Sequence, residues 1–179
     1  MPRFDTKRII FILSGIGLIT LLSLFVQNYA HAAKEGKKYG NWVVTCEKGK
    51  NQKNCFLTQS LTSAAEDGKG APQHFATFRI GYVNNSKDLQ MIQVLPFGIN
   101  LQSGSSIILS KDKLLAPGIF TTCQNFGCIA VAKISKKDLQ AITKAKEAYV
   151  GVLSLDGRQI NIKFDTKGLK EGVAALAGK

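Results

Sequence analysis

Histidine is scarce in this chain of 179 residues, which contains only His31 and His74. The sequence also lacks a G-x-S-x-G nucleophile elbow, an H-E-x-x-H helix and a phosphate-binding P-loop. Hydrolytic triads use histidine as a general base, and these motifs are the local signs of such chemistry. The sequence therefore disfavours a hydrolase. His74 stands beside Phe75 at the start of an expected strand, where we interpret it as a surface or turn residue.

The chain also has few acidic residues and few arginines. It carries 12 Asp and Glu against 24 Lys and Arg, and beyond residue 8 its only arginines are Arg79 and Arg158. A net positive charge favours anionic partners, such as an anionic polymer or a membrane surface. Recognition of nucleic acid depends on clustered arginines with interleaved aromatic residues, whereas these lysines are spread along the chain. We therefore expect a solvated, lysine-rich surface, and nucleic acid is disfavoured as a partner.

The first 32 residues have the three parts of an export signal. A positively charged segment ends at Arg8, an apolar run extends from Ile9 to Val26, and Ala30-His31-Ala32 offers a small-x-small cleavage site. Cleavage leaves residues 33–179 as the working protein, in the periplasm, on the cell surface or secreted. The alternative is an uncleaved inner-membrane anchor, because the apolar run is at the lower limit of length for a spanning helix.

Residues 33–179 show no internal repeat and no Pro/Gly/Ser-rich linker, which indicates one domain. Short runs of β-type residues alternate with turn residues and predict a mainly β fold. The expected strands are 39–46, 54–62, 73–83, 88–95, 98–101, 106–109, 113–115, 118–122, 128–134, 149–155 and 158–164. The simplest architecture is a single-domain β-sandwich of short antiparallel strands with one or two short helices.

Turn and cap residues divide these elements. Pro117-Gly118 predicts a turn, and Asp156-Gly157 is the strongest hairpin signal in the chain. Ser135 can cap a helix with Asp138 in its first turn. A second short helix is expected over residues 168–177.

The four cysteines fall into two local pairs, Cys46 with Cys55 and Cys123 with Cys128. An even number of cysteines in an exported chain indicates disulfides. Of the three possible pairings we favour the local one, because each pair lies across an expected strand–turn–strand unit. Zinc binding and thioredoxin-like redox chemistry are weaker alternatives, since their usual cysteine spacing is tighter. We expect no metal site, no cofactor and no catalytic residue.

Aromatic residues are expected to serve mainly the core. Trp42, the only tryptophan, shares a strand face with Val44 and Cys46. The same interpretation applies to most of a group of phenylalanines, which are Phe56, Phe75, Phe78, Phe97 and Phe126.

A series of segments forms an unusual combination along the mature chain. They are Tyr39-Gly-Asn-Trp42, Val43-Val44-Thr45-Cys46, Cys55-Phe56-Leu57-Thr58-Gln59, Val94-Leu95-Pro96-Phe97-Gly98-Ile99, Gly104 with Ile107-Ile108-Leu109, Thr122-Cys123-Gln124-Asn125-Phe126-Gly127-Cys128-Ile129-Ala130, and Phe164 with residues 168–176. In this order they resemble the invasion-associated locus B family of exported proteins in Gram-negative bacteria. The departure is a more basic middle turn, Lys111-Asp112-Lys113, which bears only on surface charge.

The resemblance implies a non-enzymatic, β-rich virulence or invasion-associated protein, linked in some pathogens to entry into host cells. It supplies no catalytic residues and no molecular partner. The leading hypothesis is therefore an exported protein that binds an envelope or host-surface component. The alternatives are a periplasmic housekeeping factor that binds envelope polymers or assists envelope assembly, and an enzyme that acts on envelope carbohydrate through two carboxylates.

Overall fold

The computed structural model describes residues 33–48, 53–63, 71–83, 86–109 and 113–178. The expected export signal and the apolar run within it lie outside the described residues. In the described part, no helix is both long and apolar enough to cross a membrane.

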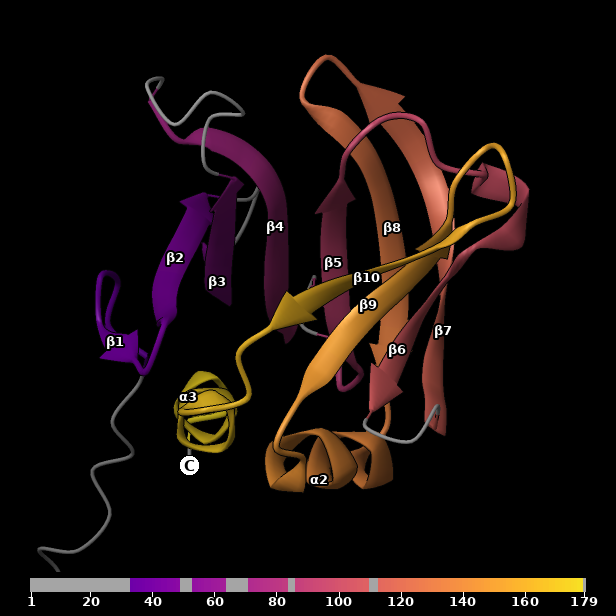
Figure 1. Cartoon of the computed structure of the whole chain (residues 1–179). Helices are drawn as coiled ribbons and strands as arrows, with labels where there is room; N and C mark the ends of the chain where they lie inside the picture. The colour runs from indigo at the N-terminus through magenta and orange to yellow at the C-terminus, as the bar shows by residue number, and fades with distance from the viewer. Residues whose placement is uncertain (1–32, 49–52, 64–70, 84–85, 110–112, 179) are drawn as a thin grey trace, which may run out of the picture. The chain divides into compact units, whose positions relative to one another are not determined.

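Ten antiparallel strands form one hydrogen-bonded sheet, in the order β1-β2-β3-β4-β5-β8-β7-β6-β9-β10 (Figure 1). The elements are β1 Lys38–Tyr39, β2 Trp42–Lys48, β3 Lys53–Ser63, β4 Gln73–Tyr82, β5 Leu89–Leu95, η1 Leu101–Ser103, β6 Ser105–Leu109, β7 Lys113–Gln124, β8 Gly127–Ile134, α2 Lys136–Lys144, β9 Ala148–Leu153, β10 Gln159–Phe164 and α3 Leu169–Leu176. The expected mainly β, single-domain fold with short helices is confirmed.

The two layers of the fold are the two halves of this one sheet. In Figure 1 the ribbon of β10 runs back from the β6–β9 side toward β4. The ring of Phe164, the last residue of β10, lies 6.4 Å from that of Trp42 on β2 and 5.6 Å from that of Phe78 on β4, measured between centroids. The sheet therefore curls until its last strand packs on its first strands, and apolar side chains fill the space between.

Polar contacts at Asp165 hold this closure. The Trp42 indole donates to the Asp165 carbonyl oxygen at 2.8 Å, and the Asp165 backbone N–H donates to the buried Gln59 side chain at 2.9 Å. The Asn41 amide donates to the Asp165 carboxylate at 2.5 Å. Each of these bonds joins residues more than 100 positions apart. Satisfied polar groups at the edge of an apolar core avoid the cost of burying them unpaired.

Strand alternation positions the rest of the core. Along β5 every second side chain from Leu89 to Leu95 is buried, and β8 shows the same pattern opposite it.

Helix α2 begins as expected, with a capping box in which Ser135 and Asp138 bond each other's backbone N–H. Helix α3 packs closely on β3, since a Cβ at Gly172 would lie 2.6 Å from Leu57.

Two local expectations are wrong. Residues 98–101 are not a strand: Ile99 makes one isolated bridge, and Asn100 caps the 3-10 turn η1 through its side-chain oxygen. Pro117-Gly118 is not a turn, because both residues lie within β7, whose pairing with β6 shifts register beside them. The missing N–H of proline is tolerated at such an irregularity, and no turn is needed there.

The closing contact predicts a large stability effect. Phe164→Ala should lower the free energy of unfolding by about 3–5 kcal/mol, the usual range for a buried phenylalanine, because this ring is 2% exposed. Urea unfolding monitored by Trp42 fluorescence measures the change. Ile119→Ala is the control, since Ile119 is 74% exposed and should change stability by less than about 0.5 kcal/mol. Equal effects of the two substitutions would contradict this role of Phe164.

Candidate binding surface

Three chain connections meet at one end of the sheet: residues 96–104 between β5 and β6, the β7–β8 turn and the β9–β10 turn (Figure 1). Backbone hydrogen bonds join the first to the third, from Leu155 N–H to the Gly98 carbonyl at 3.1 Å and from Asn100 N–H to the Leu153 carbonyl at 2.8 Å. These connections thus form one continuous surface, although they lie far apart in the sequence.

The β7–β8 turn is held against the same surface. Cys123 and Cys128 face each other across the two strands and form a disulfide, with a Cα–Cα distance of 3.9 Å. Gly127 has a φ of 134°, and a Cβ there would collide with the Leu95 carbonyl oxygen. Only glycine allows so close an approach of the turn to the end of β5.

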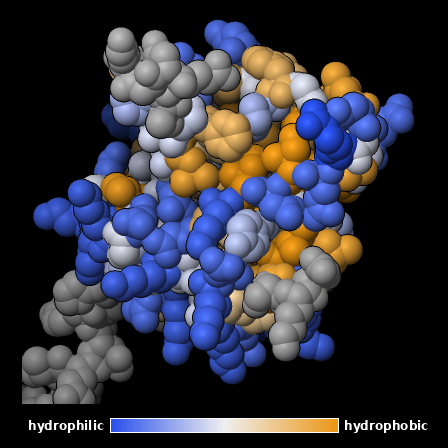
Figure 2. Space-filling view, in the orientation of Figure 1, coloured by the Kyte–Doolittle hydropathy of each residue, from blue (hydrophilic) through white to orange (hydrophobic). Residues whose placement is uncertain are grey.

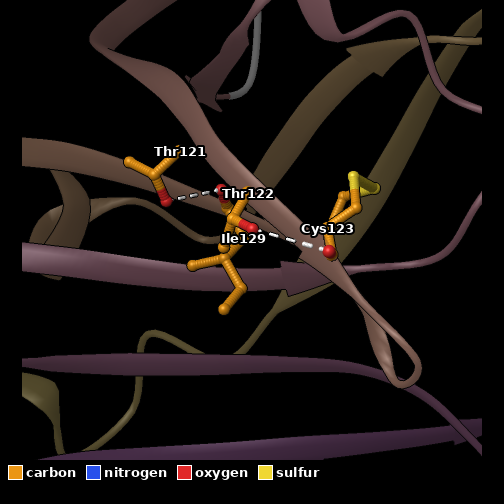
Figure 3. The surroundings of a disulfide bond; sticks show 5 residues. Thr121, Thr122, Cys123 and Ile129 are labelled. Carbon is orange, nitrogen blue, oxygen red and sulfur yellow. Dashed lines mark hydrogen bonds between the residues drawn. A yellow bond between two sulfur atoms is a disulfide. The ribbon is translucent and has the colours of Figure 1, made fainter.

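Figure 3 shows how the strands beside this disulfide are joined. The Thr121 hydroxyl donates to the Ile129 carbonyl at 3.2 Å, next to the bulge in the β7–β8 pairing. The Thr122 hydroxyl lies 3.5 Å from the Cys123 carbonyl, a weak bond at the limit of hydrogen-bond distance. The disulfide and the Thr121–Ile129 bond link the two strands of the hairpin that carries Phe126 at its tip.

Large apolar side chains project from all three connections. Phe97 is 61% exposed, Phe126 is 52% exposed and Leu155 is 76% exposed. Leu101 on η1 adds a fourth at 43%. We call these four residues the loop-end surface. Figure 2 shows apolar residues mainly over the upper half of this face, with hydrophilic residues over the lower left.

The expected core role of Phe97 and Phe126 is therefore wrong. Both lie in connections, where the alternation that directs strand side chains inward does not apply. Phe75, at 38% exposure near the start of β4, is also outside the core, whereas Phe56 and Phe78 are buried as expected. The sequence did contain a signal, since an aromatic residue within a tight disulfide loop has few buried partners within reach.

The loop end is almost free of charge. Residues 95–106, 117–128 and 153–159 contain only two charged residues, Asp156 and Arg158. These two neutralise each other through an ion pair of 2.6 Å, and the Ser154 hydroxyl donates to the same carboxylate. The hydrogen bond from Ser154, and after it the one from Arg158, lowers the pKa of Asp156 below its usual value.

A shallow groove of about 180 Å³ lies over β6 and β9, beside the end of η1. Its walls combine the polar residues Ser103 and Ser106 with the apolar Ile108 and Leu114. A mixed lining of this kind suits a chain segment better than a small molecule, which is usually enclosed by its pocket.

The other expected site residues lie elsewhere. Trp42 is fully buried, which confirms its core role. Cys46 and Cys55 form the second disulfide, across β2 and β3 with a Cα–Cα distance of 4.0 Å. Both disulfides have the local pairing that the sequence predicts. His74 is exposed, and its Nε2 lies 2.7 Å from the Thr77 hydroxyl.

Two further features of the described residues bear on a metal site and on buried polar groups. No group of three or more His, Cys, Asp or Glu residues could hold a metal ion there. The polar atoms of Gln93 and Ser105 are buried without a hydrogen-bond partner in the interior. A Cβ at Gly118 would contact both side chains, so the two lie close together in the interior.

The fold and this surface define a mainly β, disulfide-bonded domain with a loop end of zero net charge. Residues 42–177 match the family described as Invasion associated locus B (IalB) protein. The chain belongs to this family.

Curated relatives include the invasion protein B homologs of Brucella abortus strain 2308 and of Brucella abortus biovar 1 strain 9-941. Each is 27% identical over 132 residues, which is 73% of this chain and 72% of the relative. The fold is similar to the crystal structure of invasion associated protein B from Bartonella henselae, with a TM-score of 0.65 at 16% identity. That match covers 79% of this chain and 93% of the Bartonella chain.

The pKa of Asp156 provides a test of the β9–β10 turn. Since the pKa is lowered in the folded protein, the ionised carboxylate stabilises the turn above the unfolded pKa of about 3.9. This contribution is lost as the pH falls through the lower folded value. NMR titration should show the pKa of Asp156 rising in Ser154→Ala, and by a smaller amount in Arg158→Gln. An unchanged value in both variants would contradict these contacts.

The Cys123–Cys128 disulfide predicts a modest stability effect. Its removal by Cys123→Ser with Cys128→Ser should cost about 2 kcal/mol, because a loop this short restricts the unfolded chain only slightly. Chemical denaturation measures the loss. Removal of this disulfide should also speed amide hydrogen exchange at residues 124–127. The matched control is Cys46→Ser with Cys55→Ser, which should lose a similar amount of stability without changing exchange at those residues. If the Cys123→Ser, Cys128→Ser variant unfolded globally while the control stayed folded, a purely local role of the Cys123–Cys128 disulfide would be contradicted.

Proposed function

We propose that this family member is an exported, non-enzymatic protein that acts by binding an envelope or host-surface component through the loop-end surface. The observation that carries the proposal is the exposure of Phe97, Phe126 and Leu155 on three connections that are almost free of charge. Exposed apolar patches rimmed by polar residues are typical of interaction sites. Aromatic anchors supply much of the binding energy in such interfaces.

The geometry of the titratable groups supports a binding role over catalysis. His74 lies at the surface beside a threonine, and Asp156 and Glu147 are both paired with cations. A carbohydrate-cleaving enzyme needs two carboxylates about 5–10 Å apart around its substrate. The groove beside the loop-end surface has no Asp or Glu among its lining residues.

Export is supported by the two disulfides, because such bonds persist in oxidising compartments. A host-surface partner is supported by the relatives, whose names associate them with invasion. The loop-end surface is equally compatible in chemistry with a protein of the bacterium's own envelope. The experiment below therefore measures both host-cell entry and envelope integrity.

The test compares two matched double substitutions in a gene-deletion strain complemented with each variant. Phe97→Ser with Leu155→Ser removes apolar side chains that are 61% and 76% exposed. Phe75→Ser with Ile119→Ser removes side chains on β4 and β7, outside both the loop-end surface and the groove, that are 38% and 74% exposed. The loop-end pair should reduce host-cell entry at least tenfold, since each anchor contributes more than about 1 kcal/mol to binding. The Phe75 and Ile119 pair should retain entry.

Equal loss in both variants, at equal protein levels and melting temperatures, would contradict a specific loop-end role. Normal entry of the loop-end variant together with increased detergent sensitivity of the bacteria would instead support the envelope housekeeping function.

A further inference from the structure

We propose that the opposite end of the molecule, formed by β1, α2 and α3 with the segments beside them, docks on an anionic phospholipid surface. This basic end consists of residues 33–40, 135–147 and 163–172. In the sequence its lysines are spread over three distant segments. The fold collects them.

Direct contacts bring these segments together. Backbone atoms of Gly40 and Lys167 meet so closely that a Cβ at Gly40 would collide with the Lys167 carbonyl, and Gly168 stands in the same relation to Tyr39. Helix α3 contacts both β1 and α2. In Figure 1 the two helices lie side by side at the lower end of the molecule, with β1 beside α3. The three segments therefore form one surface.

The charge of this surface differs sharply from that of the loop end. The basic end contains ten lysines and five acidic residues, a net charge of +5. Equal lengths of chain at the loop end contain one acidic residue and one arginine, a net charge of zero. All ten lysines have exposed side chains. The two ends therefore differ in charge, since the basic end carries a net positive charge and the loop end carries none.

Structural contacts occupy most of the acidic residues at the basic end. Asp138 serves the capping box of α2, Glu147 pairs with Lys163 at 2.7 Å, and Asp165 accepts hydrogen bonds from Asn41 and the Lys167 backbone. Among the described residues, Lys136, Lys137 and Lys144 of α2 form no ion pair with an acidic side chain. Their charge is available to an external anion.

The course of the chain favours a membrane as the occupant. Residue 33, where the described chain begins, packs against the core beside this basic end. The sequence before it is the positively charged segment and apolar run of an export signal or anchor. A retained anchor therefore joins the domain at its basic end. Each lysine near an anionic leaflet strengthens binding about fivefold, within roughly 8 Å of the surface.

Vesicle cosedimentation of the protein, purified as it accumulates in its host, tests this docking. Vesicles of phosphatidylcholine alone are compared with vesicles containing 30% phosphatidylglycerol, a composition chosen to give roughly the surface potential of an anionic leaflet. The protein should bind the anionic vesicles more tightly and lose that preference as salt rises. Lys136→Gln, Lys137→Gln and Lys144→Gln together should weaken the preference about 100-fold.

Two control variants separate an oriented surface from net charge. Gln102→Glu, Gln124→Glu and Asn125→Asp change the net charge by the same amount at the loop end and should weaken binding far less. Lys136→Arg, Lys137→Arg and Lys144→Arg keep the charge and should bind as the unmodified protein does. Equal loss in the lysine-to-glutamine and loop-end variants, or no preference for anionic vesicles, would overturn the proposal.

If intact mass shows that the anchor is retained, the rate of lysine acetylation in proteoliposomes replaces cosedimentation. Anionic lipid should then slow acetylation at Lys167 and Lys170 relative to phosphatidylcholine, and equal rates would overturn the proposal. Binding only to soluble lipopolysaccharide-derived polysaccharide, and not to vesicles, would also overturn it. The outcome is independent of what the loop-end surface binds, because the variants and the readout differ.

Discussion

The packing of Phe164 on Trp42 and Phe78 is the contact on which the rest of the fold depends. It brings the last strand of a ten-stranded sheet onto its first strands, and the Asp165 contacts satisfy the polar groups at that junction. Without this closure, one face of the sheet would expose its apolar residues to water. The hydrophobic gain is therefore shared by strands that are never hydrogen-bonded to each other.

The topology of the closed sheet also determines which connections and helices lie at each end of the molecule. The hydrogen-bonded order β5-β8-β7-β6-β9 places the connections that carry Phe97, Phe126 and Leu155 at one end. The turn after β10 returns the chain to β1 and places α3 beside α2 at the other. An apolar end of zero net charge and a lysine-rich end thus result from one topology. In the proposed arrangement, a membrane holds the basic end while the loop end remains free to contact a partner.

Both disulfides act within single hairpins, so neither explains the closure. Cys46–Cys55 joins β2 to β3, and Cys123–Cys128 joins β7 to β8. Cross-links between neighbouring strands restrict register and local unfolding, whereas long-range cross-links restrict the whole unfolded chain. The stability of the domain therefore depends mainly on its apolar core, and the second disulfide serves the loop that presents Phe126.

The sequence by itself determined what depends on near neighbours: most strands, the Ser135–Asp138 cap, the Asp156-Gly157 hairpin, the local disulfides and the family likeness. It misplaced residues 98–101 and the Pro117-Gly118 turn, because long-range pairing overrides local turn preference there. Only the tertiary structure decided that Phe97 and Phe126 are exposed at one end and that dispersed lysines share the other. Those facts depend on which distant strands pair, and residue spacing along the chain carries little information about such pairing.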